Sequence, residues 1–282
     1  MCIKGGYCMS NPIFNKFLDK GKSLSPVPVR IEDEHVSKDL LLNNNYSDEN
    51  IVLDSSIMTV NGAINKTLIL FSCLFLSAAF TWGSLMSGFV DRAQMLTIGG
   101  AVVGFILAMV IIFSGNKSLY KVLTPIYALA EGCFIGGISA FFESSIAGIV
   151  VQAVIATMVT ILMMLTLFRA GIIRATEKFR SVLFTATLSV GAIYLIQWIA
   201  SFFGRSIPEI FTASPIGIGF SVIVVGIAAL NLINDFDFIE KGAEFSLQKE
   251  FEWYGAFGLM VTIVWLYIEI LHLLAKIAAS RD

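Results

Sequence analysis

Hydrophobic and polar residues are distributed unevenly along the chain, and the boundary between the two regions falls near residue 57. Before that boundary the apolar residues show no sustained period, and the segment contains proline at positions 26 and 28 and the asparagine run 43–45. Such a segment buries too little apolar surface to offset the loss of chain entropy on folding. The pattern therefore predicts that residues 1–57 form a disordered tail.

Beyond residue 57 the pattern changes to long, continuous apolar runs. A helix that crosses the hydrocarbon layer of about 30 Å needs about 20 apolar residues. Strands of a membrane barrel would alternate over about ten residues, and these runs are continuous and longer. Seven runs qualify, at 67–88, 96–114, 123–142, 145–168, 181–204, 216–234 and 253–275. The sequence thus predicts an all-α integral membrane protein, with a seven-helix bundle over residues 58–282.

Composition narrows the function classes. The chain has 282 residues, of which 56% are hydrophobic and 14% are charged, whereas soluble domains average about 45–50% and about 25%. A net charge of −2 without a basic tract argues against nucleic acid as a partner. The four cysteines are too scattered for a disulfide scaffold or a zinc site. Motifs for zinc hydrolysis, a serine nucleophile or phosphate binding are absent from the sequence, so we expect neither an enzyme nor a bound cofactor.

Basic residues in the loops predict the orientation. Nine lysines and arginines fall on one side of the seven runs and four on the other. The positive-inside rule therefore predicts a cytoplasmic amino terminus. The carboxyl terminus lies outside if the last run crosses the membrane, and inside if that run is re-entrant; the pattern leaves both open. Glycine pairs at four-residue spacing, Gly100 with Gly104 and Gly132 with Gly136, predict close helix packing.

A few ionisable residues lie in or beside the apolar runs, where each costs about 2.5–3.5 kcal/mol on insertion scales. They are Glu131 in the third run, Asp235 at the end of the sixth, and Glu269 with His272 in the seventh. Such groups tend to face the bundle interior or an ion path. We expect His272, one turn from Glu269, to be a hydrogen-bond neighbour of that acid or an interfacial residue, and not a metal ligand.

Helical spacing separates the two aspartates that follow the sixth run. Asn231 and Asp235 are four residues apart and share a face, which we expect to point inward. Asp237 lies on a different face, where it meets Lys241 one turn later. We therefore expect Asp237 at a solvated helix end, in a salt bridge.

Two neighbouring carboxylates cannot both ionise cheaply, so a pair would share a proton or bind a hard cation such as Ca²⁺ through oxygen ligands. Asp235 and Glu269 form the candidate pair, with Glu131 as a third member. The helical rise puts Asp235 roughly 6–9 Å deep and Glu269 roughly 24 Å deep. The two meet only if residues 253–257 lie along the interface; otherwise Glu131 is the closer partner of Asp235.

Several stretches resemble the Bax inhibitor-1 family, also called the transmembrane Bax-inhibitor-motif family. Residues 123–139, LTPIYALAEGCFIGGIS, resemble its third-helix signature. Four other stretches, 58–67, 176–180, 231–244 and 253–271, resemble its bacterial branch. Together they cover about residues 58–278, in order.

The resemblance implies a seven-helix bundle with a central carboxyl-terminal helix, a pH-sensitive calcium leak, and suppression of cell-death or stress responses. It also implies a sensor made of two acids. The stretch Asp235 to Ile239 falls on the helix-six motif and Leu266 to Ile270 on the helix-seven motif, so Asp235 and Glu269 inherit that role by position. The arginine that the family carries on its second helix has no counterpart within residues 96–114.

These observations support three hypotheses. The first is a pH-sensitive leak channel or transporter for Ca²⁺ and protons. The second is a non-transporting regulator that binds membrane proteases or stress and cell-death machinery, partly through its tail. A secondary transporter ranks third, because no inverted repeat is evident. We expect the lipid bilayer and other membrane proteins as partners, and the plasma membrane (the inner membrane, if the protein is bacterial) as the location.

Overall fold

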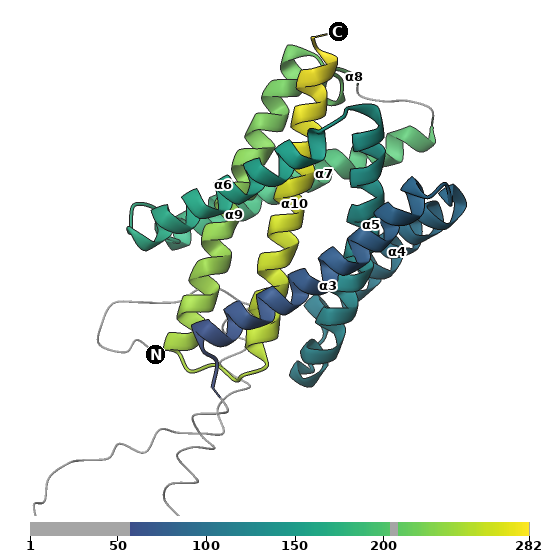
Figure 1. The fold of residues 1–282 in the computed structure, drawn as a ribbon. Helices are drawn as coiled ribbons and strands as arrows, with labels where there is room; N and C mark the ends of the chain where they lie inside the picture. The colour runs from purple at the N-terminus through teal and green to yellow at the C-terminus, as the bar shows by residue number, and fades with distance from the viewer. Residues whose placement is uncertain (1–56, 204–207, 282) are drawn as a thin grey trace, which may run out of the picture. The chain divides into compact units, whose positions relative to one another are not determined.

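The computed structural model describes residues 57–203 and 208–281, and these residues form a helical bundle (Figure 1). A short 3₁₀ turn, Lys117–Leu119, precedes α5. The α-helices are α3 (Val60–Met86), α4 (Val90–Phe113), α5 (Tyr120–Ser145), α6 (Ile149–Arg169), α7 (Glu177–Phe202), α8 (Pro208–Phe211), α9 (Pro215–Glu244) and α10 (Phe251–Ala279). Seven of them are long and apolar enough to cross a membrane, which confirms the predicted all-α, seven-helix class. The predicted tail lies outside the described residues except for Ile57.

The helices extend beyond the apolar runs that predicted them. The sixth run ends at residue 234, but α9 continues through ten further residues to Glu244. Side-chain caps mark several starts: Thr59, Thr176 and Ser214 each accept a hydrogen bond from a backbone amide in the first turn. An apolar run marks only the part of a helix that faces hydrocarbon, whereas each added residue extends the backbone ladder by one hydrogen bond. Asp235 and Asp237 therefore lie on well-defined helix faces.

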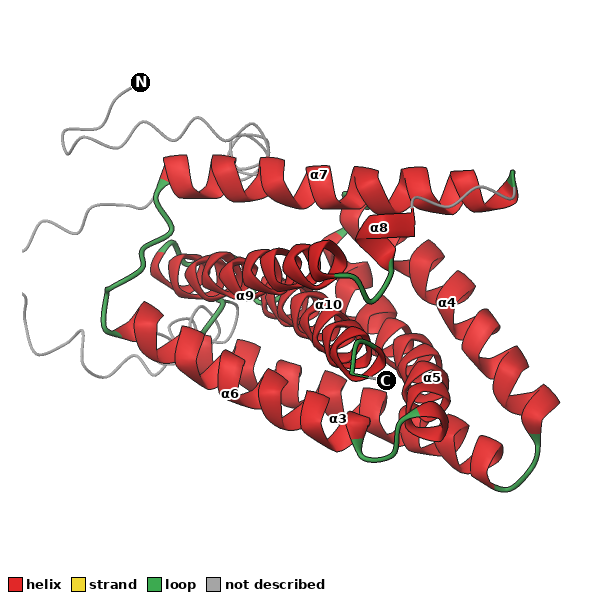
Figure 2. Cartoon of the chain, turned by 90° about the horizontal axis from the view of Figure 1, so that it is seen from above, coloured by secondary structure: helices red, strands yellow, loops and turns green. Residues whose placement is uncertain are grey.

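The last helix, α10, lies at the centre of the bundle and packs against α3, α5, α6 and α9 (Figure 2). Half of its most apolar stretch (50%) is buried, against 11% for the peripheral α7. Its 29 residues form one continuous helix, about 44 Å long at 1.5 Å per residue. This helix is long enough to span the membrane, and its first turns are buried in the bundle, with Gly255, Ala256 and Phe257 among the core residues. Residues 253–257 therefore belong to the same continuous helix as Glu269.

Glycines allow α5 to approach both of its neighbours closely. A Cβ atom at Gly136 would overlap the Ala78 carbonyl oxygen of α3, and Gly132 makes a similar approach one turn earlier. On the other side, a Cβ atom at Gly100 of α4 would lie 2.5 Å from the carbonyl oxygen of Ala130. Contacts this close exclude any larger residue, so the close packing predicted from the glycine spacing is confirmed.

Two adjacent glycines on α4 test this packing. Gly100→Ala should lower the free energy of unfolding by about 1–3 kcal/mol, because its methyl group overlaps the α5 backbone. Gly99→Ala is the matched control, because no atom lies within 4 Å of its added methyl group. Alanine is the better helix former by about 1 kcal/mol, so Gly99→Ala should be neutral or stabilising. Thermal unfolding in detergent measures both; equal destabilisation would contradict the packing.

Candidate functional site

A row of polar side chains runs along the contact between α9 and α10. On α10, Thr262, Glu269 and Lys276 recur every seven residues and therefore share one face. On α9, Asp235 lies opposite the start of this row, and Ser221 accepts a hydrogen bond from Lys276 at the other end. The two helices run antiparallel, with 14 residues, or about 21 Å, between these contacts on each. We call these five residues the α9–α10 seam.

Asp235 lies at one end of the seam with an unsatisfied carboxylate oxygen. Its Oδ1 atom lies 3.5 Å from where a Cβ atom at Gly258 would be, and the Thr262 hydroxyl approaches the carboxylate. Its Oδ2 atom is buried and has no hydrogen-bond partner among the described residues, and the same holds for Oδ1 of Asn234. Burying a polar oxygen without a partner is costly, so such atoms mark places where a proton or an ion would be favourable.

Glu269, in contrast, is fully satisfied by neutral donors. It is 3% exposed, and the Tyr194 hydroxyl of α7 lies 2.9 and 2.8 Å from its two carboxylate oxygens. The Trp265 indole donates to Oε1 at 3.0 Å. Lys276, two turns further along α10, adds an electrostatic interaction without direct contact. No sequence pattern points to Tyr194, because 75 residues separate it from Glu269.

The two acids of the candidate pair lie at different levels of the seam. Asp235 faces Gly258 and Thr262, and Glu269 follows Thr262 by seven residues, or about 10 Å along the axis. Within residues 57–203 and 208–281, no group of three or more histidine, cysteine or acidic side chains could hold a metal ion. Asp235 and Glu269 are therefore two separate positions on one line.

Glu131 lies at the contact between α4 and α5. The Tyr127 hydroxyl, one turn earlier, is a polar neighbour of its carboxylate. A Cβ atom at Gly104 of α4 would lie 3.1 Å from its Oε2 atom. The Tyr127 ring also makes an edge-to-face contact with Phe257 of α10, with ring centroids 5.0 Å apart. Which acid is the closer partner of Asp235 stays a prediction.

Asp237 is buried, contrary to its expected position at a solvated helix end. The predicted bond to Lys241 is present, at 2.9 Å, but Asp237 is only 7% exposed and also pairs with Arg180. Arg180 belongs to the first turn of α7, which covers this part of α9. A helix from elsewhere in the chain therefore shields the carboxylate that helical spacing alone would leave in solvent.

Like Asp237, the other two candidate side chains, Asn231 and His272, have partners within the protein. The Asn231 amide donates to the Thr187 hydroxyl of α7 at 3.0 Å and to the Ile227 carbonyl at 2.9 Å. His272 is exposed on the bundle surface, and its ring lies edge-to-face on Phe142 at 5.4 Å. No hydrogen bond between His272 and Glu269 is found among the described residues.

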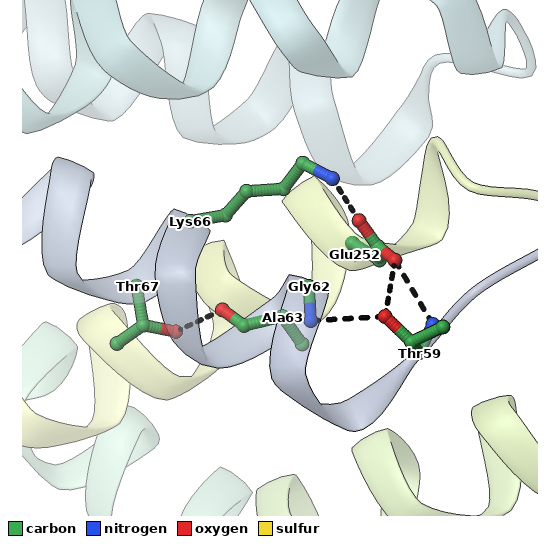
Figure 3. Close-up of polar contacts among 6 residues, drawn as sticks. All are labelled: Thr59, Gly62, Ala63, Lys66, Thr67 and Glu252. Carbon is green, nitrogen blue, oxygen red and sulfur yellow. Dashed lines mark hydrogen bonds and ion pairs between the residues drawn. The ribbon is translucent and has the colours of Figure 1, made fainter. Parts of the chain in front are cut away.

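Sequence reasoning missed Glu252, which joins the first turns of α3 and α10 (Figure 3). Glu252 is 1% exposed, accepts hydrogen bonds from the Thr59 amide (2.9 Å) and hydroxyl (3.1 Å), and forms an ion pair with Lys66. Thr59 also caps α3 through the Gly62 amide at 2.9 Å. We call Thr59, Lys66 and Glu252 the clamp. It fixes the start of α10, and with it the level of every seam residue on that helix.

The helices and the seam define this chain as a multi-pass α-helical membrane protein. The family model described as Bax inhibitor 1 like matches residues 11–279, so the chain belongs to that family. The match begins at residue 11, whereas the resemblance had covered only residues 58–278; the family similarity thus includes most of the segment before α3. No curated protein and no solved structure matches the chain.

A double-mutant cycle tests the clamp. Glu252→Gln and Lys66→Met should each destabilise the protein, because each leaves a charge without its partner. The cycle should give a coupling energy of about 0.5–3 kcal/mol, measured by unfolding in detergent. Lys121→Met supplies the control, because Lys121 is exposed. A coupling of Glu252 to Lys121 as large as that to Lys66 would count against a specific clamp.

Proposed function

We propose that this protein is a non-catalytic, pH-sensitive cation leak pathway, with Ca²⁺ as its cation and the α9–α10 seam as its path. The observation that carries the proposal is the buried Oδ2 atom of Asp235, which has no hydrogen-bond partner in the described part of the chain. A bound cation or proton would satisfy this oxygen.

A comparison of the buried acids of α9 and α10 supports the choice of Asp235. Asp237 has Arg180 and Lys241, and Glu252 has Lys66. Glu269 has two neutral donors. No salt bridge found among the described residues involves Asp235. Asp237 and Glu252 thus have positively charged partners in the protein, and Glu269 has neutral donors. For Asp235 we propose that a mobile cation or a proton takes this place.

The chemistry of this position suits a hard cation. Ca²⁺ takes six to eight oxygen ligands, including carboxylates, amide carbonyls and water. Asp235 and Asn234 offer carboxylate and amide oxygens without protein partners, and water would complete the shell. A proton on the carboxylate would remove its charge and compete with the cation. This competition is the proposed source of pH sensitivity.

The separation of the two acids favours conduction over tight binding. Ion pathways need sites that bind strongly enough to admit an ion and weakly enough to release it, usually several in series. Asp235 and Glu269 provide two such positions about 10 Å apart along α10. A single site made of both carboxylates would hold Ca²⁺ more tightly.

The direction of the path follows from the loop charges. We propose that the amino terminus is cytoplasmic and that the protein resides in a plasma membrane, because basic residues predominate on that side. The Asp235 end of the seam then faces the cytoplasm and the Lys276 end faces outward.

The regulator hypothesis depends largely on the segment before Ile57, which lies outside the described residues, so the seam leads us to prefer the leak.

Purified protein in liposomes tests this function. Asp235→Asn should lower Ca²⁺ flux about tenfold, which corresponds to a loss of about 1.4 kcal/mol of cation stabilisation. The pH dependence of the residual flux should be weaker, because asparagine carries no titratable proton and only Glu269 of the two acidic positions still titrates.

Glu131→Gln is the matched control, since it neutralises a membrane acid that lies at the α4–α5 contact. Its flux and pH profile should equal those of the unmodified protein. Unchanged flux in Asp235→Asn, or an equal loss in Glu131→Gln, would contradict the assignment of the path to the seam.

A further inference from the structure

At the end of the seam opposite Asp235, a lysine side chain is held by three oxygen atoms. The Lys276 ammonium donates to the Ser221 hydroxyl at 2.8 Å, the Ile210 carbonyl at 3.1 Å and the Gly217 carbonyl at 3.2 Å. The Phe211 ring lies 6.0 Å from the same nitrogen. None of these groups carries a negative charge. We call Ile210, Gly217 and Ser221 the oxygen cage.

The cage has the composition of a cation site. An ammonium group has three donors and no acceptor, and here each donor has one oxygen. Carbonyl oxygens are also the groups that replace the hydration shell of monovalent cations in selectivity filters. The Lys276 ammonium therefore acts as a tethered cation. It occupies a set of three oxygens that would otherwise suit a free monovalent cation.

The position of Lys276 connects this cage to the proposed path. Lys276 shares the seam face of α10 with Glu269 and follows it by seven residues, about 10 Å. The cage is also joined to Glu269 through aromatic rings. The Phe211 and Tyr194 rings are in tilted contact with centroids 5.8 Å apart, and the Tyr194 hydroxyl donates to Glu269. A cation that moved along the seam would meet the fixed charge of Lys276 before leaving it.

We propose that Lys276 occupies a monovalent-cation site at the end of the seam and thereby limits the leak. The proposal of a cation site rests on the oxygen cage alone. The proposal that Lys276 limits the leak rests on the proposed function. A fixed positive charge in a pathway excludes mobile cations by repulsion. Removing it exposes the three oxygens to K⁺.

The site is tested by thermal unfolding of the purified full chain in detergent. Lys276→Met keeps an unbranched side chain but lacks the charge, so its Tm should rise with KCl concentration relative to choline chloride, because K⁺ binds only the folded cage. The unmodified protein and Lys276→Arg should show no such difference. Adding Ser221→Ala to Lys276→Met removes one cage oxygen and should weaken the effect.

The limit on the leak is tested in liposomes with the same variants. Lys276→Met should raise cation flux several-fold, and Lys276→Arg should not. A K⁺-dependent Tm without any flux in any variant would support the cage and overturn the proposed leak. Faster flux without a K⁺-dependent Tm would overturn the cage. If Lys276→Met does not fold, Lys276→Gln takes its place, with the same two readouts and the same expectations.

Discussion

Within a hydrocarbon layer no water satisfies a buried polar group, so each must find its partner inside the protein. The arrangement of this bundle follows from that constraint. Glu252 receives Lys66 and the Thr59 backbone, Asp237 receives Arg180, and Lys276 receives three neutral oxygens. Each of these contacts joins two helices, so satisfying the charges also fixes which helices are neighbours and at what level they meet.

The central helix α10 combines most of these contacts. Its first turn is held by the clamp, its middle carries Glu269, and its last turns carry Lys276. Because one continuous helix connects all three, a displacement at either end would shift the register of α10 against α9. Asp235, whose Oδ2 atom lacks a partner, lies at this same helix contact, where its Oδ1 atom approaches Gly258. Asp235, the buried acid of α9 and α10 with an unsatisfied oxygen, therefore lies beside α10. Helix α10 is held in position at one end by the clamp and at the other by Lys276.

Membership of the Bax inhibitor 1 like family agrees with the seven membrane-length helices and extends to nearly the whole chain. The seam adds detail that the family resemblance did not supply. The two acids expected to act as a pair lie about 10 Å apart along α10, each with its own neighbours. Lys276, just beyond the last apolar run, supplies a positive charge on the same face, although the runs themselves contain no basic residue.

The sequence by itself determined the class of fold, because runs of about 20 apolar residues have one stable form in a bilayer. It also located the candidate acids of the apolar runs and placed Asp235 and Asp237 on different helix faces, since these depend only on position and helical spacing. Only the tertiary structure decided their partners. Lys66 and Glu252 are 186 residues apart, and Arg180 and Asp237 are 57 apart. No local pattern encodes such pairs, because they arise from how whole helices pack. That packing gave Asp237 and Glu252 basic partners and left one carboxylate oxygen of Asp235 without a partner among the described residues.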